Sequence, residues 1–145
     1  MGVKFTYRKN LCNKLNKLKL EITIILNKSK QIMNKNLNKI RYSILEICAK
    51  TKEGHIGSAF SIIEIVYIIF KKFIKKNFFI LSKGHASIGI YAIMNNLNLI
   101  SNSKLNSFCK LNSKLGGHPD STKIPILNFS TGSLGHGLPT STGLA

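Results

Sequence analysis

The four histidines of this 145-residue chain are the side chains with the clearest capacity for chemistry. His55, His85, His118 and His136 each follow a glycine. Glycine allows the backbone to turn sharply, so that an imidazole can project from a loop toward a ligand. Imidazole also exchanges a proton near neutral pH, which suits acid and base catalysis. The pattern predicts a polar site without naming its reaction, and a solvated or locally hydrogen-bonded histidine is the alternative at each position.

A glycine-rich loop, Gly-Ser-Leu-Gly-His-Gly, occupies residues 132–137. Its backbone N–H groups could cradle a phosphate at the start of a helix. The glycine spacing does not match a P-loop and no lysine follows, so a tight turn before a closely packed helix is the alternative. Residues 124–145 contain no charged side chain, which is typical of backbone that approaches a ligand or a packed surface closely. No acid or thiol lies at a recognisable ligand spacing from the histidines, so we predict no metal site.

The strongly basic composition could indicate nucleic-acid binding. Lysine and arginine number 22 against 5 acids, for a net charge of +17. However, arginine occurs only at Arg8 and Arg41, and the basic N-terminal region lacks interleaved aromatic residues. Lysine is accompanied by many asparagines and isoleucines, the trio that an A/T-biased coding sequence produces. We therefore expect the charge to lie on solvated faces, with a nucleic-acid-binding module as the less favoured alternative.

The sequence shows no pattern typical of a membrane span, a cleaved leader or a disulfide framework. It has no apolar run of about 18 residues that could span a membrane, and no apolar stretch with a cleavage site follows the basic N-terminus. We therefore expect a cytoplasmic chain without a membrane partner. Cys12, Cys48 and Cys109 are odd in number and far apart, which favours free thiols over disulfides.

Hydrophobic periodicity predicts helices in the first half of the chain. Residues 1–10 are expected to be an unstructured basic lead, and residues 11–27 have helical spacing weakened by β-branched residues. Residues 31–49 form a clearer amphipathic helix, which residues 53–57 should end. Its apolar face would comprise Met33, Leu37, Ile40, Ile44 and Ile47, with Lys35 and Lys39 turned away.

Short strands and further helices are predicted beyond residue 57. Ser58 or Ser61 could cap a helix that runs to about Ile74, and residues 61–64 fit a capping box. The apolar run at 78–81 indicates a buried strand, and a second strand is expected near 126–129. Helices are expected at 85–97 and 103–111, with a loop at 112–123, and another helix after residue 137, where Pro139 would fit its first turn.

Four short segments together resemble the transketolase family, in its N-terminal, thiamine-diphosphate-binding domain. Each is weak alone, but they occur in the family's order and approximate spacing, and the likeness extends over about residues 31–145. It is closest to the stand-alone N-terminal subunits of enzymes that are split into two chains. The segments are 53–58 (Glu-Gly-His-Ile-Gly-Ser), 80–86 (Ile-Leu-Ser-Lys-Gly-His-Ala), 116–120 (Gly-Gly-His-Pro-Asp) and 130–137 (Ser-Thr-Gly-Ser-Leu-Gly-His-Gly).

The resemblance implies roles for three of the histidines. His55 matches the histidine that faces the reactive carbon of the cofactor and the hydroxyls of the sugar. His118 matches one that hydrogen-bonds the donor sugar and assists proton transfer, so these two are the candidate catalytic residues. His85 matches a contact of the cofactor diphosphate. His136 stands where relatives usually have glutamine, so the resemblance gives it no role.

The glycine-rich loop supplies the other candidate cofactor-binding residues. Gly132, Ser133 and Leu134 match the loop that packs against thiamine diphosphate, with Leu134 beside the thiazolium ring. The resemblance also implies a Mg²⁺ ion. In the family its ligands come from a Gly-Asp-Gly segment and an asparagine that follow the glycine-rich loop, and this sequence contains neither of these two features after residue 137. The chain therefore offers no metal ligands of its own.

The implied fold is α/β: the N-terminal part of a thiamine-diphosphate-binding domain with a parallel sheet, mostly helical within this chain. Residues 1–30 would be a basic N-terminal extension, and residues 31–145 a partial transketolase domain. The implied reaction transfers a two-carbon ketol unit between sugar phosphates, with a C-terminal subunit or domain as partner and a dimeric assembly. We expect a truncated and marginally stable chain, since an incomplete sheet leaves apolar faces uncovered. An inactive gene product is the alternative.

Overall fold

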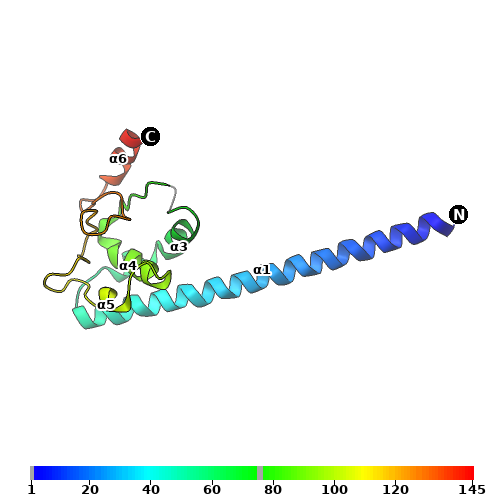
Figure 1. Cartoon of the computed structure of the whole chain (residues 1–145), viewed down its shortest axis with the longest axis horizontal. Helices are drawn as coiled ribbons and strands as arrows, with labels where there is room; N and C mark the ends of the chain where they lie inside the picture. Colours follow the sequence, from blue (N-terminus) through cyan, green and yellow to red (C-terminus); the bar gives the residue numbers. More distant parts are fainter. Residues whose placement is uncertain (1, 75–76) are drawn as a thin grey trace. The chain divides into compact units, whose positions relative to one another are not determined.

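The described part of the molecule is helical. The structure is a computed structural model that describes residues 2–74 and 77–145, with side chains from residue 17 onward. Residues 1–36 and 37–145 form two separate units. The helices, shown in Figure 1, are α1 (Gly2–Thr51), α2 (Ile56–Phe60), α3 (Ile63–Lys72), the 3-10 helix η1 (Gly84–Ala86), α4 (Ser87–Asn96), α5 (Asn102–Leu105) and α6 (Gly137–Leu144).

Helix α1 is continuous over residues 2–51, where the sequence predicts a basic lead followed by two helices. The prediction of an unstructured lead is wrong for residues 2–10. No glycine or proline occurs between Val3 and Glu53, so no residue in this stretch has a strong intrinsic tendency to end the helix. The helix ends as predicted before residue 53, where Lys52 (φ +60°) and Gly54 (φ +105°) adopt left-handed backbone conformations.

The core of the second unit forms around α4 and the last turns of α1. The predicted apolar face of α1 is confirmed from residue 37 onward, since Ile40 and Ile44 have exposed fractions of 1% and 0%. Met33 is half-buried, and Lys35 and Lys39 are exposed as predicted. Every residue of α4 from Ser87 to Met94 is buried, and the helix packs against α2, α3 and α5. The hydrophobic effect on these faces holds the unit together.

The connection between α2 and α3 differs from the predicted cap. Ser61 ends α2, and its Oγ donates a hydrogen bond to the Ser58 carbonyl at 2.8 Å. Ile62 is the residue that precedes α3, and it has no side-chain cap. The predicted capping box is therefore wrong, because the hydroxyl of Ser61 turns back to the preceding helix. Helix α3 ends at Lys72 rather than near residue 74.

The two predicted strands are absent from the described residues, and segments 78–81 and 126–129 have irregular or turn conformations. A strand needs a neighbouring strand to accept and donate its backbone hydrogen bonds. Here side chains make those bonds instead. The Phe79 N–H donates to Asn128 Oδ1 at 3.1 Å, and Thr131 Oγ1 donates to the Leu81 carbonyl at 2.6 Å.

The remaining predicted elements are largely confirmed. The 3-10 helix η1 and α4 together cover the helix predicted at 85–97. Helix α5 is shorter than predicted, begins at the N-cap Ser101, and gives way to turns in which Cys109 has a φ of +54°. Residues 112–123 form the expected loop, and Pro139 lies in the first turn of α6. Among the helices of the described residues, none has the length and apolar character needed to cross a membrane.

Candidate active site

His55 and His85 lie side by side, although 30 positions separate them in the sequence. Their ring centroids are 5.1 Å apart with an interplanar angle of 78°. His55 directly precedes α2, and His85 lies in η1. The turn before His55 requires glycine, because Gly54 has a φ of +105° and a Cβ there would lie 2.8 Å from Cys48 Sγ.

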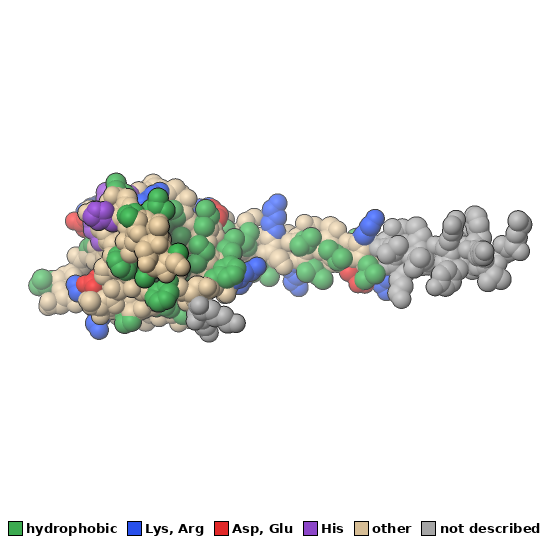
Figure 2. Space-filling model, turned by 90° about the horizontal axis from the view of Figure 1, so that it is seen from above, with side chains coloured by type: hydrophobic (Ala, Val, Ile, Leu, Met, Phe, Trp, Pro, Cys, Tyr) green, Lys and Arg blue, Asp and Glu red, His purple; other side chains and the backbone are tan. Residues whose placement is uncertain are grey.

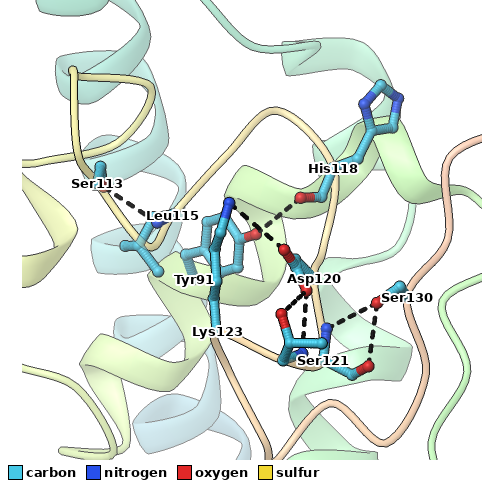
Figure 3. Close-up of polar contacts among 9 residues, drawn as sticks. Tyr91, Ser113, Leu115, His118, Asp120, Ser121, Lys123 and Ser130 are labelled. Carbon is cyan, nitrogen blue, oxygen red and sulfur yellow. Dashed lines mark hydrogen bonds and ion pairs between the residues drawn. The ribbon is translucent and has the colours of Figure 1, made fainter.

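His118 is presented by the loop at 112–123, which α4 anchors through two side chains. Ser87 Oγ donates to the Gly117 carbonyl at 2.8 Å, and the Tyr91 hydroxyl donates to the His118 carbonyl at 3.4 Å. Figure 3 shows this second bond, with the His118 ring pointing away from Tyr91. Burial raises the pKa of Tyr91 well above its usual range, so its hydroxyl stays a proton donor. The backbone of His118 is thus held while its imidazole is exposed.

The carboxylate of Asp120 does not orient His118. Figure 3 places the His118 ring away from Asp120, whose carboxylate accepts from the N–H and hydroxyl of Thr122 at 2.9 and 2.6 Å. Lys123 Nζ lies 3.4 Å from the same carboxylate. The hydrogen bonds from Thr122 lower the pKa of Asp120. Asp120 therefore stabilises its own turn, and the His118 imidazole remains available to a ligand.

The segment 130–137 packs directly against the turn that carries His85. A Cβ on Gly84 would lie 2.9 Å from the Thr131 carbonyl oxygen. A Cβ on Gly137 would overlap Ser82 Cβ. Both positions require glycine, because the backbones approach too closely for a side chain between them. The contact fixes the glycine-rich loop relative to η1.

Gly132 brings this loop to the third histidine. A Cβ on Gly132 would lie 3.9 Å from His118 Cδ2, so the ring and the loop backbone are neighbours. The Thr131 N–H donates to the Pro119 carbonyl at 3.3 Å, which ties the two segments together. His55, His85, His118 and Gly132 therefore converge from four separate segments. Figure 2 shows the histidine side chains gathered on one part of the surface.

Lys83 and two other imidazoles lie close enough to His85 to affect its protonation. Partial burial lowers the pKa of His85 below its ordinary value of 6.5, and nearby His55, Lys83 and His118 lower it further. The neutral imidazole is therefore favoured at neutral pH. A neutral imidazole can donate one hydrogen bond and accept another, whereas the protonated ring can only donate.

The outer part of the glycine-rich loop is less enclosed. Ser133 and His136 are exposed, and Leu134 has an exposed fraction of 69%. The His136 N–H donates to the Ser133 carbonyl at 3.5 Å, so the loop closes on itself before α6 begins. An apolar ligand or partner surface would be needed to cover Leu134.

Sequence reasoning missed the residues that support the site. Ser87 and Tyr91 anchor the His118 loop, and Thr131 anchors the glycine-rich loop to Leu81. Lys83 Nζ donates to Ser61 Oγ at 3.0 Å and joins the His85 turn to the end of α2. No local sequence pattern indicates this contact, because 22 positions separate the two residues.

The residues present fit an organic anion better than a bare metal ion. The imidazoles and the backbone of the glycine-rich loop can supply N–H donors to an anion. No side chain separates the backbones of Gly84 and Thr131, which lie in direct contact. Among the side chains that the structure describes, in residues 17–74 and 77–145, no group of three or more histidine, cysteine or acidic residues could hold a metal ion. The imidazoles of this site are therefore suited to hydrogen-bond a ligand.

Sequence comparisons with known proteins place most of this chain in one family. The sequence model described as "Transketolase, thiamine diphosphate binding domain" matches residues 32–145. The chain is 32% identical over 128 residues to a transketolase of Aquifex aeolicus, which covers 81% of this chain and 19% of that protein. It is also 32% identical over 124 residues to one subunit of the apulose-4-phosphate transketolase of Actinobacillus succinogenes, covering 78% of this chain and 45% of that subunit. The chain thus spans less than half the length of these relatives, and it belongs to the transketolase family through the family's thiamine-diphosphate-binding domain.

Proposed function

We propose that this chain supplies the thiamine-diphosphate-binding part of an enzyme that transfers a two-carbon ketol unit between sugar phosphates. The convergence of His55, His85 and His118 beside Gly132 is the observation that supports this most directly. Three imidazoles and a close-packed backbone suit a ligand with a charged diphosphate and a sugar with several hydroxyl groups. Residues 31–145 would be part of the thiamine-diphosphate-binding domain, whose parallel sheet would be formed outside the described residues, and residues 1–30 would be a basic extension.

The chain's own residues would bind the cofactor and move protons. When bound, thiamine diphosphate accepts the electrons of the bond that breaks in the donor sugar. His85 would donate a hydrogen bond to a diphosphate oxygen, and the backbone of Gly132 and Ser133 would line the cofactor. Leu134 would lie beside its thiazolium ring and exclude water. Since cofactor binding would bury Leu134, its present exposure of 69% should fall.

His55 and His118 would act on the sugar. Both imidazoles are exposed and border the same site, so each could reach a sugar hydroxyl. Either ring could accept the proton of a sugar hydroxyl while the adjacent carbon–carbon bond of the sugar breaks and the hydroxyl carbon becomes a carbonyl, and could return the proton in the reverse direction. The Tyr91 hydrogen bond to the His118 carbonyl would keep the second ring in place during this transfer.

The rest of the enzyme would come from a partner. We propose a C-terminal transketolase subunit or domain, a dimeric assembly and a cytoplasmic location. The Actinobacillus succinogenes relative is itself one subunit of a transketolase, which supports a division between chains. Mg²⁺ would then require oxygen ligands from outside the described residues, because hard cations prefer carboxylate and carbonyl oxygens.

Calorimetric titration with thiamine diphosphate and Mg²⁺ tests the proposal, with and without a C-terminal subunit of a split transketolase. We expect saturable heat in the presence of the partner, and ketol transfer that His118→Ala reduces by about 10²-fold or more, as for loss of an acid or base catalyst. His136→Ala is the matched control, since it removes an exposed histidine from the adjacent loop. Absence of heat under both conditions would contradict the proposal and favour an inactive gene product.

A further inference from the structure

Lys83 is the only lysine or arginine in the four segments that form the site. The other charged side chains there, apart from histidine, are Glu53 and Asp120, and Asp120 is already bonded to Thr122 and Lys123. These segments otherwise present imidazoles, hydroxyls and backbone. The segments are 53–58, 80–86, 116–120 and 130–137.

The backbone on both sides of Lys83 is fixed. Gly84 packs against the Thr131 carbonyl, and Ser82 packs against Gly137, each at a distance that excludes a side chain. Lys83 therefore emerges from a turn that cannot shift without moving the glycine-rich loop. A fixed backbone limits the region that the Lys83 ammonium can reach, which lowers the cost of ordering it when a ligand binds.

The ammonium of Lys83 is directed by Ser61. Lys83 Nζ donates to Ser61 Oγ at 3.0 Å, and Ser61 Oγ donates in turn to the Ser58 carbonyl at 2.8 Å. An ammonium group has three donors, so this contact leaves two for other acceptors. Within the described residues, the ion pairs are Arg41–Glu64, Lys50–Glu46 and Lys123–Asp120, and none involves Lys83. The half-buried charge is thus available to an anion.

The positive charge of Lys83 affects the protonation of His85. It contributes, together with His55 and His118, to the lowered pKa of His85. Positive potential and N–H donors therefore coincide at one place. Phosphoryl oxygens are the natural complement, because they are ionised acceptors for both the ammonium of lysine and the N–H of imidazole.

We propose that Lys83, positioned by Ser61, binds a phosphoryl oxygen of the ligand in this site. The identity of the ligand rests on the proposed function: the oxygen belongs either to the diphosphate of the cofactor or to the phosphate of the sugar. Lys83 is then a binding residue that acts beside His85, and Ser61 is a positioning residue that acts through Lys83.

Inorganic pyrophosphate is the direct probe, titrated calorimetrically into the full chain. We expect saturable binding that Lys83→Met weakens about 10-fold, which corresponds to about 1.4 kcal/mol for one charge-assisted contact. Lys83→Arg should retain most of the affinity, and Ser61→Ala should lose less than Lys83→Met. Lys110→Met removes the same charge from an exposed turn outside the site and should leave the affinity unchanged.

A second titration distinguishes the two sources of the phosphoryl group. If the cofactor provides it, Lys83→Met weakens thiamine diphosphate but not thiamine. If the sugar provides it, the variant weakens fructose 6-phosphate but not fructose. Either pattern supports the inference.

Equal affinities of the wild-type chain and Lys83→Met for pyrophosphate, thiamine diphosphate and fructose 6-phosphate would overturn the inference. The same holds if the wild-type chain binds none of them. If the wild-type chain binds pyrophosphate through Lys83 but does not bind thiamine diphosphate even with the partner present, the proposed function fails and the anion site stands.

Discussion

Helix α1 carries apolar side chains at helical spacing on both sides of residue 37, but their burial differs completely. Leu18, Ile22 and Ile25 have exposed fractions of 47%, 55% and 62%, whereas Ile40 and Ile44 have 1% and 0%. The residue types and the helix are the same in both stretches. Periodicity therefore predicts which side chains share a face, while burial depends on whether other elements cover that face.

The difference in burial also decides which part of the chain can hold the side chains of a site in place. In residues 37–145, buried helices hold four irregular segments at fixed distances, as at Gly84 against Thr131. Residues 17–32 form a helix whose large apolar side chains remain exposed. The histidines thus occur where packing can fix a loop, and the lysine-rich helix contributes no such loop.

The largest expected difference is between truncation of a buried isoleucine of α1 and truncation of an exposed one. Ile44→Ala should cost about 2–5 kcal/mol of unfolding free energy, because it leaves a cavity in the core. Ile25→Ala should change the free energy by about 0.5 kcal/mol or less, as at exposed positions generally. Urea denaturation followed by circular dichroism measures both. Comparable losses would mean that Ile25 is covered in solution.

Two glycines of α6 differ in packing, because Gly137 lies against Ser82 and Gly143 faces open space. Gly137→Ala should cost about 1–3 kcal/mol, because its Cβ would overlap Ser82 and force the backbone to move. Gly143→Ala should instead stabilise the helix by about 0.4–1 kcal/mol, since nothing lies within 4 Å of its Cβ. Thermal melts compare the two variants. A destabilising Gly143→Ala with a neutral Gly137→Ala would reverse the expected order.

Local patterns predicted much of the helical structure and little of the long-range contacts. The apolar face from residue 37 to 47 follows directly from its spacing, as does the end of α1 before Gly54. The strand at 78–81 was predicted from an apolar run, but a strand depends on a neighbour that a short window of sequence cannot reveal. In the described structure the Phe79 N–H is bonded to the side chain of Asn128 instead.

The candidate site was predicted by motif order, not by periodicity. His55, His85 and His118 were selected because four segments together resemble one family, and the structure brings these three side chains into one region. The supports of the site were missed, because Tyr91 and Thr131 look like ordinary core residues in the sequence. Their hydrogen bonds span 27 and 50 positions, which no local pattern can predict.

The pKa of a histidine should also differ between the second unit and the exposed face of α1. The pKa of His85 lies below its ordinary value because of partial burial and neighbouring positive groups. A histidine introduced by Ile25→His, on the exposed face of α1, should titrate near about 6.5. Two-dimensional NMR of the imidazole resonances measures both, with assignment by His85→Gln.

The sign of the pH effect follows from the neutral form being favoured in the folded state. The stability contributed by His85 should be present above the unfolded-state pKa of about 6.5 and should decrease as the pH falls below it. Lys83→Met should raise the pKa of His85, and Lys110→Met should leave it unchanged. A pKa of His85 at or above that of the introduced histidine would contradict the assigned environment.

The smallest effect should come from the ion pair between α1 and α3. Arg41 donates to Glu64, and both side chains are partly exposed, by 33% and 48%. Glu64→Gln should therefore cost less than about 1 kcal/mol, because water competes for exposed charges, and high salt should reduce the loss further. Denaturation at low and high salt measures it, with Glu46→Gln as the control for a pair within α1. A loss as large as that of Ile44→Ala would mean that charge, and not the apolar face, holds the end of α1 in the second unit.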